Sequence, residues 1–112
     1  MRKSQIIRRD RDFELIFATG KKIHLSDLTL IHLKRNDDNS LNRFAFLVSK
    51  KISKKAHERN LLKRRLRAIC RALPLKNKGL DIVLIPKPNI LVNDFKGLKE
   101  LTEAIFRKAK LL

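Results

Sequence analysis

The longest amphipathic pattern in the chain lies between residues 53 and 73. Apolar side chains recur there at i, i+4, i+7 and i+11, a spacing that places them on one face of a helix. These side chains are Leu62, Leu66, Ile69 and Leu73. Ser53 is a residue type favoured at a helix N-cap, and Pro74 cannot continue a helix. We therefore predict a long helix from Ser53 to about Leu73 with a single buried face.

Two segments before this helix are predicted to be strands. Residues 43 to about 50 alternate in type, with one set on each face of a strand. The first set is Phe44, Phe46 and Val48, and the second is Ala45, Leu47, Ser49 and Lys51. Residues 28–33, "LTLIHL", form the other strand, and the polar loop between the two predicts a hairpin. Residues 22–25 leave room for a short extra strand.

The N-terminal part predicts an exposed basic arm over residues 1–9, followed by a short helix over residues 11–19. Asp10 is suited to capping this helix and Gly20 to ending it. Phe13, Ile16 and Phe17 share one face of the helix. Two phenylalanines at this spacing are usually core residues, although a partly buried ring can also line a groove.

The C-terminal part predicts a central strand and a final helix. Residues 81–86, "DIVLIP", are continuously apolar after Asp81, as in a strand buried on both faces. Asn93 is suited to capping the last helix, whose apolar stripe is Phe95, Leu98, Leu101, Ile105 and Ala109. The predicted fold class is α+β, a two-layer α/β sandwich with the order αβββαβα. Phe44, Phe46, Phe95 and Phe106 are assigned to its core.

Charge sets this chain apart from an ordinary small domain. Its 112 residues predict a single domain, 1–112, and 43% of them are hydrophobic, which argues against disorder. Lys and Arg number 28 against 11 Asp and Glu, a net charge of +17 with an isoelectric point near 10.9. Self-repulsion of this size favours a polyanionic partner. Nucleic acid is the expected class, with an anionic membrane surface as a weaker alternative.

The positive charge is concentrated on the predicted helix and the turn before it. Residues 48–71 hold ten Lys or Arg and one acid, Glu58. On a helical wheel the cations progress across the side opposite the leucines, and Arg59 lies at the edge of the apolar stripe. Guanidinium groups bind phosphate oxygens through two hydrogen bonds, and lysines act as point charges. The alternative is a merely solvated helix face, but a single acid cannot neutralise it through i, i+4 pairs.

Other kinds of site find little support in the residues. The acids are scattered, and no nucleophile–base order or phosphate-binding glycine loop is present, so the polypeptide is not expected to catalyse a reaction itself. His24 and His57 lack partners at metal spacing, so no metal site is predicted. Cys70 falls in the apolar stripe and is assigned a packing role. The single cysteine and the absence of a signal or membrane segment predict a cytoplasmic protein without membrane or small-molecule partners.

These motifs resemble the protein component of bacterial ribonuclease P. "VSKK" at 48–51 matches the end of a strand in that family, and "RNLLKRRLRAICR" at 59–71 matches its basic helix. The family's opening Asp-Phe pattern is matched at Asp12 and Phe13, with Phe17 and Gly20 following. Departures are Leu61 in place of the usual second Arg, Ser53 for Gly, Ala68 for a polar residue, and a non-aromatic residue at Ile31. The phosphate contact of that second Arg is expected to be missing in this chain or to be made by Arg65.

The resemblance implies both fold and function. It implies a left-handed crossover through the basic helix, against the usual hand of such connections. It also implies an accessory subunit of an endoribonuclease that binds the catalytic RNA subunit and the 5′ leader of precursor tRNA, while the RNA performs Mg²⁺-dependent cleavage. The residues expected to bind the catalytic RNA are Lys54, Lys55, Arg59, Asn60, Lys63, Arg64, Arg67 and Arg71. Those expected to bind the leader are Phe13, Phe17, Ile31, Leu47, Ser49 and Lys51.

Two alternatives remain open at this point. A ribosomal or other structural RNA-binding protein would share the charge without any role in cleavage. A sequence-specific DNA-binding protein would use residues 54–73 as a recognition helix, but no preceding helix stands at helix-turn-helix spacing.

Overall fold

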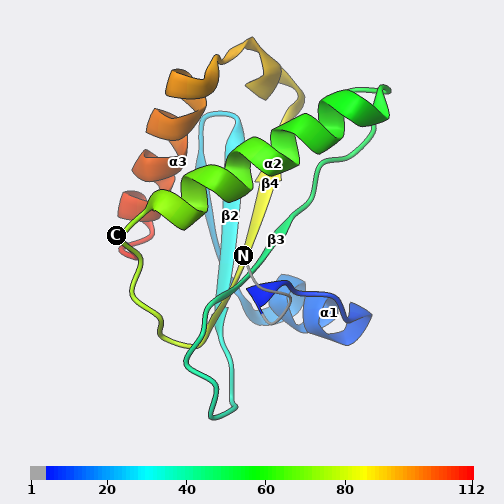
Figure 1. Ribbon diagram of the computed structural model, residues 1–112. Helices are drawn as coiled ribbons and strands as arrows, with labels where there is room; N and C mark the ends of the chain where they lie inside the picture. Colours follow the sequence, from blue (N-terminus) through cyan, green and yellow to red (C-terminus); the bar gives the residue numbers. More distant parts are fainter. Residues whose placement is uncertain (1–4) are drawn as a thin grey trace.

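A four-stranded sheet lies between helices in this protein (Figure 1). The structure, a computed structural model, describes residues 5–112. Its elements in chain order are α1 (Asp10–Thr19), β1 (Lys21–Leu25), β2 (Leu28–Lys34), β3 (Arg43–Phe46), α2 (Ala56–Ala72), β4 (Leu80–Pro86), the 3₁₀ helix η2 (Pro88–Val92) and α3 (Phe95–Lys108). The predicted α+β class and the order αβββαβα are confirmed, including the short extra strand, β1.

The strand order β1-β2-β4-β3 makes β4 central, as its continuous apolar run predicts. β4 is antiparallel to β2 and parallel to β3, with Ile82 facing His32 on one side and Phe44 on the other. The predicted hairpin between residues 28–33 and 43–50 is therefore wrong, because β4 inserts between these two strands. The loop before β3 crosses one end of the sheet instead of making a tight turn.

The connection from β3 through α2 to β4 joins parallel neighbours. Figure 1 views the sheet through α2, with both strands running upward and β4 on the left of β3. A right-handed crossover seen from its helix side would place the second strand on the right, so this crossover is left-handed, as the family resemblance implies.

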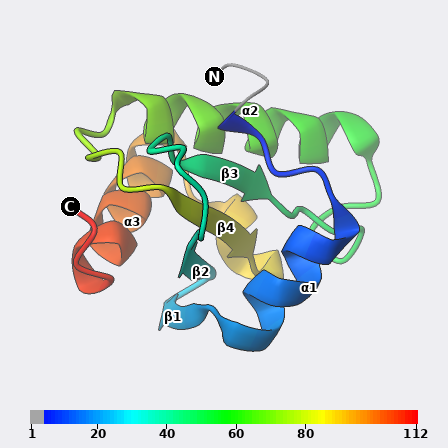
Figure 2. The same cartoon turned by 90° about the horizontal axis from the view of Figure 1, so that it is seen from below.

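The two faces of the sheet have separate cores. The larger core lies under α2 and α3 and includes Phe44, Phe46 and Leu84. The smaller one lies under α1 and joins Ile16 to Ala45 and Val83 of the sheet. Figure 2 shows α1 on one side of the sheet and α2 on the other. The alternation predicted for residues 43–48 is confirmed, although the strand itself ends at Phe46.

Three predicted helix caps are wrong. Ser53 does not cap α2, because its hydroxyl accepts from the backbone N–H of Lys55 in a local turn, and the helix begins only at Ala56. Asp10 is the first helical residue of α1 rather than its cap. Asn93 instead closes η2, an element that the sequence pattern did not predict, by donating to the Ile90 carbonyl. Asp94 caps α3 by accepting from the N–H of Gly97 at 2.8 Å.

Two further predictions are corrected by burial. Phe95 is 46% exposed rather than buried, because Ile90 of η2 enters the core just before α3 begins. The predicted basic arm is not free over its whole length, since Ile7 is buried and its N–H donates to the Phe44 carbonyl at 3.0 Å. This contact extends the pairing at the edge of β3 and covers part of that edge. Residues 1–4 of the predicted arm lie outside the described residues.

A buried cluster of charges fastens the loop before β3 to the sheet. Asp81 accepts from Arg43 through both carboxylate oxygens at 2.7 Å and from Arg35 at 3.0 Å. The Asp81 hydrogen bonds raise the pKa of Arg43 above its usual value. Arg35 also donates to the carbonyls of Leu80 and Asn39. Arg43 lies 3.5 Å from Asp12 of α1, so the same cluster connects that helix to β3 and β4.

Replacing Asp81 with Ala should destabilise the protein more than any exposed acidic substitution. The Asp81 and Arg35 side chains are only 4% and 7% exposed, so the change removes a buried carboxylate that pairs with two cations. Arg35 then keeps only the exposed Asp37, and Arg43 keeps only Asp12 at 3.5 Å. We expect a loss of about 3–5 kcal/mol in the free energy of unfolding, measured by urea denaturation. The exposed Asp38→Ala should change it by less than about 0.5 kcal/mol. Equal effects of the two substitutions would show that the cluster does not hold the loop.

Candidate nucleic-acid interface

The apolar face of α2 anchors the helix as predicted. Leu62, Leu66 and Ile69 are at most 5% exposed and pack in the larger core, and Leu73 just beyond the helix is buried with them. Cys70 is buried in the same core, and burial raises the pKa of its thiol to about 12. Its predicted packing role is confirmed, because a thiol with so high a pKa is a poor nucleophile near neutral pH.

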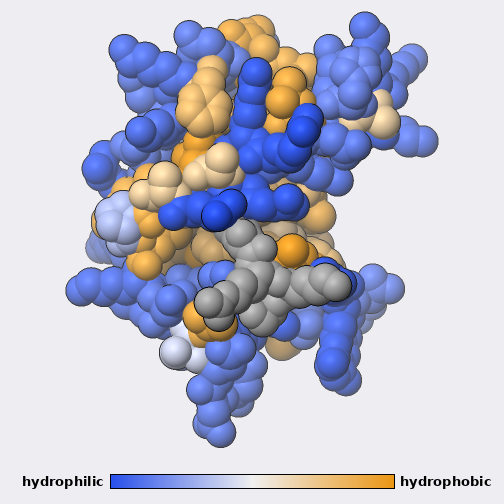
Figure 3. Space-filling model, in the orientation of Figure 1, coloured by the Kyte–Doolittle hydropathy of each residue, from blue (hydrophilic) through white to orange (hydrophobic). Residues whose placement is uncertain are grey.

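The predicted RNA-binding side chains occupy the remaining surface of α2 and the turn before it. Figure 3 shows strongly hydrophilic side chains across the middle of this face of the molecule. The exposed members are Lys54, Lys55, Asn60, Arg64 and Arg71, and the half-buried ones are Arg59, Lys63 and Arg67. The half-buried cations flank the apolar face, so their stems rest on the protein while the outer residues face solvent.

Acidic side chains do not neutralise this surface within residues 5–112. The ion pairs of that region involve Arg35, Arg43 and Arg107, and none includes a cation of residues 50–71. Glu58, the one acid of the segment, accepts a hydrogen bond from the Ser53 hydroxyl, which lowers its carboxyl pKa. The positive charge of α2 therefore remains available to a partner from outside the described chain.

Arg67 has a buried hydrogen-bond donor without an acceptor in the described part of the chain. Its Nε atom is buried without a hydrogen-bond partner among the described residues. A buried donor without an acceptor costs about 1–3 kcal/mol. Arg59, by contrast, donates to the backbone carbonyl of Ser53 at 2.9 Å and so holds the turn before α2. Arg59 therefore has a structural contact that Arg67 lacks.

The opposite flank of α2 is apolar in this chain. Leu61 is 38% exposed and lines a hollow of about 210 Å³ with Leu91 of η2. Arg65 is exposed and lies at the same hollow. The cations are thus unevenly distributed, with Lys63 and Arg67 on the β3 side and Arg65 alone on the η2 side.

The second predicted surface lies on the α1 side of the sheet. Phe13 and Phe17 stack with ring centroids 6.4 Å apart and an interplanar angle of 25°. Phe13 packs at the smaller core, whereas Phe17 is 38% exposed. Leu47 is half-buried beside them, and Ser49 and Lys51 are exposed where the chain leaves the sheet. Ile31 does lie on this face, but at 2% exposure it is covered by protein and offers no surface to a ligand.

Gly20 sets how closely α1 approaches the sheet. A Cβ atom at this position would lie 2.6 Å from the Ile16 carbonyl oxygen and 2.7 Å from Cγ2 of Ile31. Glycine is therefore required by close approach, and its backbone is extended rather than left-handed. The close approach at Gly20 is consistent with the burial of Ile31 beneath α1.

The two predicted surfaces meet at the edge of β3. Lys63 of α2 lines one hollow, of about 350 Å³, together with Leu47, Ser49 and Ile85. A neighbouring hollow of about 200 Å³ brings Lys63 and Arg67 to Phe13 of α1. Sequence reasoning missed Ile85 as part of this surface, although alternation along a strand covered on both faces would have placed it beside Val83.

Two histidines, His24 of β1 and His32 of β2, lie in the sheet. His32 is half-buried, and burial lowers its pKa. The Nδ1 atom of His24 lies 2.8 Å from the Thr29 hydroxyl. Within residues 5–112, no three His, Cys, Asp or Glu side chains gather as a metal site would require. No helix in that part of the chain is both long and apolar enough to cross a bilayer.

The fold and these surfaces define a small α+β protein with an unneutralised basic helix beside a partly apolar strand face. The chain belongs to the ribonuclease P protein component family: the Ribonuclease P family model matches residues 1–110. The ribonuclease P protein component of Microcystis aeruginosa is 38% identical over 101 residues, covering 87% of this chain and 84% of the relative. That of Syntrophomonas wolfei is 38% identical over 111 residues, covering 97% and 90%.

Solved structures agree with this assignment. The RNase P protein of Thermotoga maritima has a TM-score of 0.75 and 32% identity, covering 91% of this chain and 96% of its own. The RNase P protein of Staphylococcus aureus has a TM-score of 0.86 at 21% identity, covering 97% and 98%, which supports the fold alone. Family membership sets the chain apart from the ribosomal and DNA-binding alternatives and places it in an endoribonuclease complex.

Proposed function

We propose that this protein binds the catalytic RNA of ribonuclease P through α2 and assists removal of the 5′ leader from precursor tRNA. The observation that carries the proposal is the set of α2 cations without carboxylate partners in the described chain. Folded RNA offers closely spaced phosphates, and guanidinium groups match their geometry.

The leader of precursor tRNA is proposed to lie along the β3 edge between α1 and α2. Stacked rings beside cations hold single strands with little sequence preference. Phe17 supplies the exposed ring, Lys51 an exposed cation, and Lys63 a cation shared with the hollow at Leu47. Ile31 is left out of the proposed contact surface because α1 covers it.

In this proposal the RNA subunit performs the chemistry, hydrolysis of one phosphodiester bond with Mg²⁺. The relatives are named as a protein component, which supports a division of labour with a further component. The protein contributes affinity and position, and its cations reduce phosphate repulsion where Mg²⁺ must gather. The protein should therefore matter most when Mg²⁺ is scarce.

Adding the protein to purified catalytic RNA should increase cleavage of precursor tRNA at low Mg²⁺ concentration. The reason is that the α2 cations replace part of the charge screening that Mg²⁺ otherwise provides. The measurement is the single-turnover rate of 5′ leader release across a Mg²⁺ series. Spermidine at equal total charge is the control for unspecific screening. An absence of stimulation by the protein at every Mg²⁺ concentration would rule out the proposed function.

Arg67→Ala should weaken binding to the catalytic RNA and flatten its salt dependence. Removing one phosphate contact should reduce the slope of log K against log[salt] by about one unit or less. The matched control is Lys99→Ala, which removes an exposed cation from α3. Filter binding over a range of salt concentrations gives both slopes. Equal slopes for the wild type and Arg67→Ala would place this side chain outside the RNA contact.

Phe17→Ala should reduce affinity for precursor tRNA with a leader by about tenfold, within the range for one base–aromatic stack. Affinity for leaderless tRNA should change little. Leu15→Ala is the matched control, because Leu15 is 55% exposed on the other flank of α1. If Phe17→Ala weakens both tRNA forms equally, its ring serves the fold rather than the leader.

A further inference from the structure

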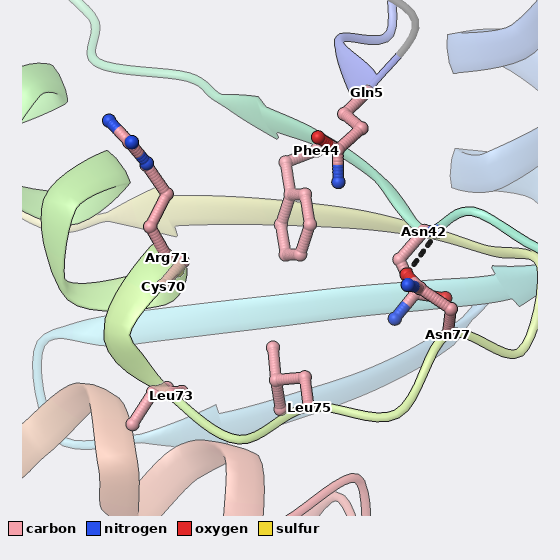
Figure 4. Close-up of a pocket in the computed structure, with 8 residues that line it drawn as sticks. All are labelled: Gln5, Asn42, Phe44, Cys70, Arg71, Leu73, Leu75 and Asn77. Carbon is pink, nitrogen blue, oxygen red and sulfur yellow. Dashed lines mark hydrogen bonds between the residues drawn. The ribbon is translucent and has the colours of Figure 1, made fainter. Parts of the chain in front are cut away.

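A hollow of about 480 Å³ lies at the C-terminal end of α2, where Arg71 of the basic surface forms part of its lining. It is open to solvent between α2, the start of β3 and the segment that leads into β4. Figure 4 shows Arg71 and Asn77 on opposite sides of the Phe44 ring, with Gln5 above and Leu75 below. Its size lies in the range of about 300–1,000 Å³ typical of small-ligand sites.

The Asn77 side of this hollow is held rigidly. Asn42 is 2% exposed and uses both ends of its amide, because Nδ2 donates to the Lys76 carbonyl and Oδ1 accepts from the N–H groups of Lys78 and Leu80. Its backbone N–H donates to the Oδ1 atom of Asn77 at 3.0 Å. With Oδ1 so occupied, Asn77 is oriented to offer its Nδ2 amino group to a ligand. This hydrogen bond orients the amide of Asn77, whose side chain is otherwise exposed.

The chemistry of the walls favours a planar, uncharged, hydrogen-bonding ligand. Leu73, Leu75 and Phe44 supply apolar contacts, and Asn77 supplies an amide edge. The one cation, Arg71, is exposed on the outer side, and the adjoining end of α2 carries the negative end of the helix dipole. A free phosphate is therefore poorly matched to the interior of the hollow. A nucleotide fits better, because its base can occupy the apolar interior while its phosphate lies outside on Arg71.

We propose that this hollow is a subsite for one unpaired nucleobase of the bound RNA. The inference rests on the proposed function, because Arg71 continues the basic surface of α2 and would bring an RNA strand to this point. Proteins commonly recognise RNA by stacking unpaired bases on aromatic rings or guanidinium planes and by hydrogen bonds to base edges. Arg71 and Asn77 provide these two contacts across the apolar floor.

The test is an NMR titration of the ¹⁵N-labelled full chain with adenosine 5′-monophosphate, uridine 5′-monophosphate and ribose 5-phosphate. At least one nucleotide should shift the Asn77 side-chain amide and the Arg71 Nε–H resonance in a saturable way. Ribose 5-phosphate should shift them far less, because it lacks a base. Equal shifts with ribose 5-phosphate, or none with either nucleotide, would overturn the subsite.

Asn77→Asp should weaken nucleotide binding by about tenfold, since the carboxylate removes the Nδ2 donor but keeps an acceptor for the Asn42 N–H. The matched control is Asn89→Asp, an exposed position on η2 with the same change of charge. Arg71→Gln provides a second test that leaves the Asn77 side of the hollow unchanged, and thermal melts check that each variant folds. Unchanged nucleotide affinity in both Asn77→Asp and Arg71→Gln would contradict the inference.

The cleavage assay with catalytic RNA separates the two proposals. Stimulated cleavage by a protein that binds no nucleotide would overturn only the subsite. A protein that binds nucleotides at Asn77 but never stimulates cleavage would overturn the proposed function and leave the subsite as a nucleotide site.

Discussion

The unpaired positive charge of α2 is the constraint on which the rest of this structure depends. Its cations repel one another and form no ion pairs within the described chain, so packing of the apolar face must supply most of what holds the helix. Leu62, Leu66 and Ile69 provide that packing against the sheet. A flexible tail of equal charge would also attract RNA, but it would fix neither the spacing nor the direction of its cations. The fold thus converts a basic segment into a surface of defined shape.

The sheet holds the other surfaces in fixed positions relative to α2. β4 contacts both β2 and β3 and is buried on both faces, so α1 and α2 are positioned on a common layer. The Asp81 cluster connects that layer to the loop before β3 and, through Arg43 and Asp12, to α1. The Phe13 ring and the Lys63 side chain, which come from helices on opposite faces of the sheet, therefore line the same hollow at the edge of β3.

Much of this architecture was predictable because its signals are local. The leucine stripe of α2, the alternation of residues 43–48 and the apolar run of β4 each follow from the periodicity of one segment. The position of β4 between β2 and β3 was not predictable in this way, because strand pairing depends on contacts distant in sequence. The left hand of the crossover came only from family resemblance. The caps at Ser53 and Asn93 failed because these side chains bond to nearby backbone groups in turns.

The candidate site was also only partly predictable, because some of its features depend on contacts between distant segments. The basic residues could be placed on the outer face of a helix by counting. The burial of Ile31 could not be predicted in this way, because it depends on the close approach of Gly20 to Ile31, a contact between two separate segments. The joining of the two surfaces by Lys63 and Ile85 likewise required the assembled sheet. Leu61 exposes an apolar side chain on one flank of α2 beside Arg65, while the opposite flank carries Lys63 and Arg67.

Lysine acetylation footprinting of the complex with catalytic RNA tests the central claim most directly. Mass spectrometry compares the reactivity of each lysine in the free and the RNA-bound protein. The account predicts strong protection of Lys54, Lys55 and Lys63 by the RNA, with Lys96 and Lys99 of α3 as reactive as in the free protein. Protection confined to α3, with the lysines at α2 still fully reactive in the complex, would contradict it.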